Sequence, residues 1–295
     1  MPSGHGRSCW SYWDEQKPRC PFLDSGQLSV YSVEWMKSLL QKAISEYTDL
    51  GIDQQIDYEK LYLYSIVTHS TALEGSTVTE IENQILLDEG IGCAKPIMEQ
   101  LMNLDLKAAY ERGFDLASRP IDWTIQVLCQ LSALVMQRTG SSYKTMSGEF
   151  NSARGQLRLV NVSAGRGGKS YLAWQKIPER LEAFCRHLNQ EQEGLAHHAI
   201  FEVYRHSFLA HYQLAEIHPW ADDNGRMARL VMNMIQRQFG LVPSIVKRES
   251  RGAYIQALAK CQEQENPAEF VEFMLSHHIQ NLQQQIAEYK SSMER

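Results

Sequence analysis

The sequence lacks a long apolar run, a closely spaced cysteine pair and an excess of positive charge. Its most apolar stretch, residues 125–136, is interrupted by Gln126, Gln130 and Ser132, so it falls short of the ~18 apolar residues of a membrane helix. The 6 cysteines include no CxxC pair and are too few for a disulfide scaffold in 295 residues. Residues 1–18 have no apolar segment of a secretory signal. These absences predict a reduced, cytoplasmic protein with no membrane partner.

The overall charge argues against a nucleic-acid partner. There are 29 Lys and Arg residues against 35 Asp and Glu residues, which gives a net charge of −6. An acidic chain does not attract nucleic acid through its overall field. With 43% hydrophobic and 22% charged residues, the composition is that of an ordinary globular protein, which excludes a disordered or fibrous chain.

The sequence also lacks the usual zinc motifs. It has no HExxH and no Cys/His spacing typical of a zinc site. Adjacent histidines occur at His197-His198 and His277-His278, but neighbouring side chains point to different faces of a helix. We expect these four residues to lie on the surface or to pack structurally.

Most of the chain has the periodicity of amphipathic helices. Thr79 followed by Glu82 has the spacing of a capping box, which marks one helix start. The fold class is therefore predicted to be mainly α. The expected helices cover residues 34–47, 58–73, 81–87, 96–116, 122–138, 178–189, 197–217, 226–239, 252–264 and 267–289.

One glycine-rich window interrupts the helices and predicts a small hairpin. Residues 157–162 alternate enough for a short strand, and residues 171–174 suit the returning strand. Residues 163–170 form the turn between them. The segment ends in Gly-Lys-Ser but lacks both the spacing and the following helix of a phosphate-binding P-loop, so we interpret it as the tip of the hairpin.

The most informative segment runs from His218 to Arg226. A helix must end near Ile217, because Pro219 disfavours the α conformation in the residue before it. The run Asp222-Asp223-Asn224-Gly225 is typical of a turn that starts a new helix. Taken singly, a histidine before proline is usually only a helix C-cap, and such a turn is usually only a turn.

Charged residues in this segment indicate an anion site. Free amides at a helix N-terminus bind anions, while Arg226 and Arg229 lie three residues apart in the new helix's first turn. A cation there opposes the helix dipole, so two arginines predict an anion between them and the amides. Forked guanidinium groups suit phosphate. Asp222 suits Mg²⁺, and His218 is the nearby base at neutral pH.

These residues resemble the motif of the Fic family, HPFx(D/E)GN(G/K)R, with a further arginine three residues on. Two positions depart from the pattern. Trp220 replaces the usual Phe at a position that anchors the loop in the core. Asp223 replaces a Gly that normally adopts a positive φ; Asp adopts that conformation better than most residues, and it adds a negative charge beside the expected phosphates.

The resemblance extends over roughly residues 122–275. Gly155-Gln156-Leu157-Arg158, followed by Val162-Ser163-Ala164-Gly165, is similar to the family's G-x-x-R and flap, and the segment containing Tyr254 is similar to the part that lines the adenine pocket. The resemblance implies a helical bundle with one β-hairpin flap. It divides the chain into an N-terminal helical region (1–120), a Fic core domain (121–276) and a C-terminal helical tail (277–295).

A second motif occurs before the core domain. Ser70 to Gly75 fits the family's inhibitory pattern, (S/T)xxxE(G/N), although Glu74 alone reads as a solvated residue in a helix's last turn, where its charge opposes the dipole. The resemblance implies that Glu74 pairs with Arg226. This pairing would take the arginine away from the γ-phosphate of ATP and let the nucleotide bind in a non-productive pose.

The resemblance therefore implies a protein adenylyltransferase that moves AMP from ATP to a Tyr, Ser or Thr hydroxyl of a target protein. His218 would be the base, Asp222 the Mg²⁺ ligand and Glu74 the inhibitory residue, and relatives with this helix often dimerise. Phosphates or nucleotide would be held by Asp223, Asn224, Gly225, Arg226, Arg229 and Tyr254. The target would dock on a flap that includes Val162, Ser163, Ala164 and Gly165.

Three alternatives remain open at this stage. The same loop serves a kinase in related proteins, although that branch lacks the N-terminal glutamate helix. Removal of AMP with the help of Glu74 is a second possibility. The third is a nucleotide-binding scaffold whose transfer activity is impaired by Asp223.

Overall fold

The structure is a computed structural model that describes residues 28–164, 170–195, 199–264 and 266–294. This part of the chain is mainly helical, as predicted, and divides into two compact units. One unit contains residues 28–52 and 252–294, and the other contains residues 53–251. None of the helices within the described ranges is long and apolar enough to cross a membrane. The predicted three-part division of the chain stays a prediction.

The smaller unit is made of three helices from the two ends of the described chain. Tyr47 is buried and donates its hydroxyl to Gln285 at 2.9 Å, and Lys290 forms an ion pair with Glu46 at 2.5 Å. These contacts join its first helix to its last. The helices are α2 (Leu28–Asp49), α10 (Arg251–Gln264), whose first residue belongs to the larger unit, and α11 (Ala268–Met293).

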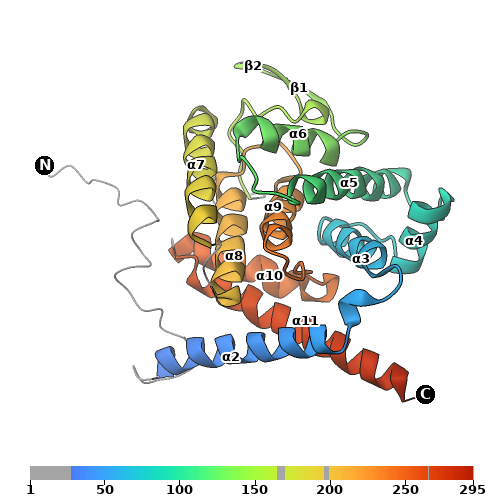
Figure 1. The fold of residues 1–295 in the computed structure, drawn as a ribbon. Helices are drawn as coiled ribbons and strands as arrows, with labels where there is room; N and C mark the ends of the chain where they lie inside the picture. Colours follow the sequence, from blue (N-terminus) through green and yellow to red (C-terminus); the bar gives the residue numbers. More distant parts are fainter. Residues whose placement is uncertain (1–27, 165–169, 196–198, 265, 295) are drawn as a thin grey trace, which may run out of the picture. The chain divides into compact units, whose positions relative to one another are not determined.

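The larger unit contains the other helices and one small sheet. Helix α9 packs against α3, α5, α6 and α8, and Figure 1 shows it in the middle of these elements. The helices are α3 (Tyr58–Leu73), α4 (Glu80–Glu89), α5 (Ile97–Leu116), α6 (Ile125–Val135), α7 (Ile177–Leu195), α8 (Ile200–Ile217) and α9 (Asn224–Gln238). The strands are β1 (Ser142–Thr145) and β2 (Gly148–Asn151).

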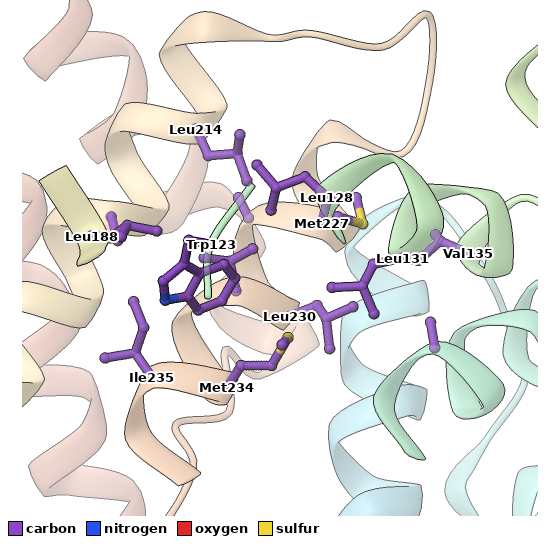
Figure 2. Close-up of a cluster of buried hydrophobic side chains, with 14 of the residues drawn as sticks. Trp123, Leu128, Leu131, Val135, Leu188, Leu214, Met227, Leu230, Met234 and Ile235 are labelled. Carbon is purple, nitrogen blue, oxygen red and sulfur yellow. The ribbon is translucent and has the colours of Figure 1, made fainter. Parts of the chain in front are cut away.

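The core of the larger unit explains why these helices form. Figure 2 shows apolar side chains from α6, α7, α8 and α9 converging around Trp123, which lies just before α6. Almost every residue of α9 from Arg226 to Gln236 is buried. Burial of apolar side chains therefore fixes the helix that carries the predicted arginines. The core side chains labelled in Figure 2 are Leu128, Leu131, Val135, Leu188, Leu214, Met227, Leu230, Met234 and Ile235.

The capping box at the start of α4 is confirmed. The Thr79 hydroxyl accepts a hydrogen bond from the Glu82 amide at 3.3 Å, and the Glu82 carboxylate accepts one from the Thr79 amide at 2.9 Å. Both bonds satisfy amides that a helix start otherwise leaves without partners.

The position of the predicted hairpin is wrong. The strands pair at β1 and β2, where Tyr143 lies opposite Phe150 and their rings stack with centroids 4.8 Å apart. Residues 157–162 and 171–174 form no strands. They approach each other through one antiparallel bridge between Ser163 and Ser170, beside a hydrogen bond of 3.0 Å from the Tyr171 amide to the Val162 carbonyl.

Arg158 explains why no longer ladder forms there. Its guanidinium donates to the carbonyls of Val160 and Leu172, each at 2.6 Å. A side chain therefore satisfies acceptors that a strand partner would otherwise use. We keep the name flap for residues 157–174. Residues 165–169, which include Gly165 of the predicted docking segment, lie outside the described residues.

The core makes a direct prediction about stability. Leu131 is buried in α6 of the larger unit, whereas Leu61 of α3 is exposed. Leu131→Ala should lower the free energy of unfolding by about 2–5 kcal/mol, because it removes buried methyl groups and leaves a cavity. Leu61→Ala, the matched control, should lower it by less than about 1 kcal/mol. Urea unfolding followed by circular dichroism would measure both, and equal losses would contradict this description of the core.

Candidate active site

His218 stands at the point where α8 ends. Its φ of 51° and ψ of 59° are left-handed, and its amide donates to the Leu214 carbonyl at 3.0 Å. This is the C-cap position that the following Pro219 predicts. The backbone then turns away from the helix, and the His218 imidazole projects from the end of α8.

The His218 imidazole is a neutral base in this environment. It stacks on the Tyr171 ring with centroids 3.7 Å apart and 15° between the planes. Burial lowers the pKa of His218 to about 4, with a further contribution from the Arg158 charge. The hydrogen bond that the ring donates to the Ala215 carbonyl and the negative charges of Asp222 and Glu74 raise the pKa, but they do not offset the effect of burial. At neutral pH the ring can therefore accept a proton.

Arg158 ties this histidine to the flap. Its Nε donates to the His218 carbonyl at 2.8 Å, and its amide donates to the Pro219 carbonyl at 3.0 Å. The same guanidinium holds the carbonyls of Val160 and Leu172. Sequence reasoning quoted Arg158 within a motif but gave it no role. Two of the three carbonyls that it binds lie far along the chain, so no local sequence signal indicates this role.

Buried contacts of Trp220 and Asn224 stabilise the loop between α8 and α9. Trp220 is fully buried, as predicted, and its indole donates to the Gly155 carbonyl at 3.1 Å. The Asn224 side chain accepts from the Trp220 amide and donates to the Trp220 carbonyl, each at 3.0 Å, and it also donates to the Asp222 carbonyl at 3.2 Å. The Asn224 side chain thus holds the turn that precedes α9.

Asp223 adopts the left-handed conformation that the family's glycine would take, with a φ of 64°. Its side chain is buried and accepts a hydrogen bond of 2.8 Å from the Ser132 hydroxyl of α6. Burial raises its pKa well above the ordinary value, although the charge of Arg226 acts against this. The carboxyl therefore points into the larger unit, and the sequence expectation of an added negative charge beside the phosphates needs correction.

Arg226 and Arg229 are both buried in the first turns of α9, with 2% and 3% of their surface exposed. Nη2 of Arg226 lies 3.4 Å from Asp222 Oδ1 and 3.2 Å from the Met136 sulfur. Its Nε and Nη1 have no hydrogen-bond partner among the described residues. Burying donors of a cation without acceptors is costly. Arg226 is therefore a candidate for binding an anion.

Glu74 pairs with Arg229 and not with Arg226 as predicted. Its Oε1 lies 2.5 Å from Nη2 of Arg229. Ser70, the first residue of the predicted inhibitory pattern, supplies two more acceptors to Arg229, its hydroxyl at 2.8 Å and its carbonyl at 3.0 Å. Because Ser70 and Glu74 are one helical turn apart, both reach the same guanidinium. Arg226 points instead toward Met136 and Asp222.

The carboxylate of Glu74 also reaches the start of α9. A Cβ added to Gly225 would lie 2.5 Å from Oε1 of Glu74, so only glycine leaves room for the contact. Burial raises the pKa of Glu74, but Arg229, helped by Arg226 and Arg251, more than offsets this and lowers the net pKa. Glu74 is therefore an anion that occupies the helix N-terminus.

The end of α3 is anchored so that Glu74 is held in place. Arg251 donates to the Leu73 carbonyl at 2.8 Å. The Thr71 hydroxyl donates to Asn103 of α5 at 2.9 Å, and the Ser76 amide donates to the Thr71 carbonyl at 3.1 Å. These bonds fix the helix on both sides of the glutamate.

Asp222 is the exposed acid of the loop. Its side chain is 62% exposed, and Oδ1 accepts from the Asp223 amide at 2.7 Å. The loop therefore presents a carboxylate to solvent beside the helix N-terminus, while the neighbouring Asp223 turns inward. The role of Asp222 as a Mg²⁺ ligand stays a prediction.

Tyr254 is the predicted site residue that does not belong to the larger unit. It belongs to the smaller unit, where it is buried and its ring centroid lies 6.0 Å from that of Phe270. Its predicted contact with the nucleotide stays a prediction. Among the docking residues, Val162 bonds to Tyr171, Ser163 forms the bridge to Ser170, and Ala164 follows at a bend.

The environment of His218 makes a prediction about its titration. We expect a pKa of about 4 for His218 in the wild type, because the flap excludes water from the ring. Tyr171→Ser uncovers the ring and should raise this pKa toward 6.5. Tyr143→Ser, a matched change in β1, should leave it unchanged. Titration by NMR of the histidine ring protons would contradict this account if Tyr171→Ser had no effect.

Comparison with known proteins identifies the domain. Residues 122–236 match the Fic/DOC family. Protein adenylyltransferase Fic of Drosophila sechellia is 29% identical over 201 residues, which cover 67% of this chain and 37% of that protein, and the Drosophila melanogaster protein matches equally. The chain thus spans little more than a third of the length of these relatives.

Solved structures show the same fold. A Fic domain containing signaling protein from Bacteroides thetaiotaomicron has a TM-score of 0.71 and 20% identity, over 86% of this chain and 98% of that one. Fic-1 from C. elegans has a TM-score of 0.69 and 21% identity, over 90% of this chain and 76% of that one. Residues 122–236 therefore form a domain of the Fic/DOC family, and the fold is that of Fic-domain proteins.

Proposed function

We propose that this protein transfers AMP from ATP to a hydroxyl group of a target protein and that Glu74 restrains the reaction. One observation carries the proposal: two arginines are buried at the start of α9, Arg229 pairs there with the Glu74 carboxylate, and a neutral imidazole stands at the end of α8. The Drosophila relatives are named protein adenylyltransferases, which is the activity we assign.

The phosphates of ATP would bind at the N-terminus of α9. Backbone amides at Asn224 and Gly225 would face the anion, and the Asn224 side chain supports them by holding the turn. Arg226 offers two donors without protein partners. Arg229 offers a third contact when Glu74 releases it. Asp223 would contribute through its backbone, since its carboxyl bonds to Ser132.

Asp222 is suited to hold Mg²⁺ on these phosphates. Mg²⁺ prefers hard oxygen ligands and usually keeps several waters beside one or two carboxylates. The Asp222 carboxylate is exposed, and only its Oδ1 accepts the Asp223 amide. The ion would neutralise phosphate charge, while the protein supplies one carboxylate and the helix amides.

His218 would accept the proton of the target hydroxyl. The hydroxyl oxygen forms a bond to the α-phosphorus, the bond from that phosphorus to pyrophosphate breaks, and the proton passes to the imidazole. A pKa of about 4 keeps the ring unprotonated before the reaction. Arg226, Arg229 and the α9 amides would stabilise the leaving pyrophosphate, since positioning and charge stabilisation dominate such reactions.

The flap would hold the target segment near His218. Ser163 and Ala164 are exposed beside a single bridge, and an extended segment can add to such an edge through main-chain hydrogen bonds. Arg158 connects this backbone to the His218 carbonyl. A hydroxyl on the docked segment would thus be brought toward the imidazole.

Glu74 would inhibit by competing with phosphate for the same groups. Its carboxylate contacts Arg229 and lies against Gly225, so ATP can reach these groups only when the side chain leaves. Because α3 is anchored by Arg251 and Asn103, side-chain rotation is the smaller movement. This position also favours a second role, in which Glu74 helps water remove AMP from a modified target.

Labelling with ATP that carries its radioactive atom at the α-phosphate tests the transfer. We expect weak self-labelling of the wild type and at least tenfold more for Glu74→Gly, because Arg229 is then available to phosphate. His218→Ala in the Glu74→Gly background should reduce labelling by about 10²–10⁴-fold, since the base is lost. Label transferred only from the γ-phosphate would contradict adenylyl transfer and favour a kinase. ATP binding without transfer in every variant would favour a scaffold.

Variants of the two neighbouring aspartates test whether Asp223 impairs the site. Asp223→Gly in the Glu74→Gly background should change labelling by less than about threefold, because its carboxyl faces Ser132 and not the phosphate side. Asp222→Ala, the comparison variant, should abolish most Mg²⁺-dependent labelling. A rise of more than about tenfold in Asp223→Gly would show instead that Asp223 impairs the site.

A further inference from the structure

Three potential metal ligands meet between α7 and α8, away from the predicted active site. They are His187 and Glu191 of α7 and His206 of α8, and their ligand atoms all lie within 4.8 Å of one another. Nδ1 of His187 is 4.0 Å from Oε1 of Glu191. Neither the family motif nor the proposed reaction uses any of these residues. Sequence reasoning missed them because the third ligand lies on another helix.

The spacing of the ligands agrees with the geometry of a zinc site. Residues i and i+4 share one face of a helix, so His187 and Glu191 point to the same side. The His187 and His206 ring centroids are 5.8 Å apart and the planes are inclined by 44°. Two imidazoles on one tetrahedral Zn²⁺ place their centroids about 5 Å apart, given Zn–N bonds of about 2 Å.

Burial favours the ligating form of both histidines. Burial lowers the pKa of His187 to about 4, and burial together with the charges of His187 and Arg205 lowers that of His206 to about 3. Both rings are thus neutral at pH 7, with a lone pair for a metal. The repulsion from Arg205 is moderated by Glu202, which binds its Nε at 2.7 Å.

The cluster is buried at His206 and exposed to solvent at Glu191. His206 is 8% exposed, whereas the Glu191 side chain is 48% exposed. A metal could therefore enter past Glu191 and keep water in the remaining position, which is typical of sites with three protein ligands. Rotation of the exposed Glu191 side chain is enough to shorten its distance to the imidazoles.

We propose that His187, Glu191 and His206 bind one Zn²⁺ or a similar borderline dication, which cross-links α7 to α8. Two imidazoles and one carboxylate suit Zn²⁺, whereas Mg²⁺ prefers a set of oxygens. The site is separate from the nucleotide chemistry. His206 lies on α8 twelve residues before His218, the C-cap of that helix, which corresponds to about 18 Å along the helix axis.

Zinc titration of the full chain tests the site. After removal of metal with a chelator, calorimetry without nucleotide should give one Zn²⁺ per chain. Glu191→Gln and His187→Gln should each weaken this binding at least tenfold. Glu193→Gln provides the matched control, because it removes the same charge two positions away on the exposed surface of α7. His197→Gln/His198→Gln should also bind like the wild type.

Two further readouts separate a built site from adventitious binding. Zn²⁺ at a hundredfold excess over its Kd should raise the Tm of wild type and Glu193→Gln by about 5 °C, but not that of Glu191→Gln. Co²⁺ should give the visible spectrum of tetrahedral coordination, and Mg²⁺ should not compete. No saturable binding, or equal binding by Glu191→Gln and the wild type, would overturn the proposal.

Discussion

The burial of two guanidinium groups at the start of α9 is the constraint on which the site depends. Helix N-termini carry partial positive charge, so Arg226 and Arg229 oppose the dipole, and both are almost fully buried. An uncompensated buried charge is strongly destabilising. The structure meets this demand through Glu74 and Ser70 for Arg229 and through Asp222 for Arg226. Stability and anion binding are thus two consequences of one arrangement.

The same arrangement fits the inhibitory role that we propose for Glu74. Its carboxylate satisfies the guanidinium and the helix end in the way that a phosphate would, and Gly225 provides the space. ATP offers more negative charge and more acceptor oxygens than one carboxylate, but it must first displace a group held by an anchored helix. In the proposed mechanism, the balance between bound glutamate and bound nucleotide would therefore be electrostatic.

The sequence predicts local features better than partners that are distant in the chain. The helices and the Thr79 capping box follow from neighbouring residues, whereas the buried Trp220 and the left-handed Asp223 follow from the family resemblance. The predicted partner of Glu74 was wrong because Arg226 and Arg229 lie on the same helix. Only the packing of α9 against α3 decides which of the two faces Glu74. The hairpin was misplaced because Arg158, a side chain, takes backbone acceptors. The ligand cluster of α7 and α8 depends on tertiary packing.

The environment of His218 connects the flap to the chemistry. The end of a helix favours a cation, so a histidine at the C-cap of α8 should by itself have a raised pKa. Its pKa is instead lowered to about 4, because Tyr171 covers the ring and Arg158 places a positive charge nearby. Both residues belong to the flap. The segment proposed to hold the target therefore also lowers the pKa of the proposed base.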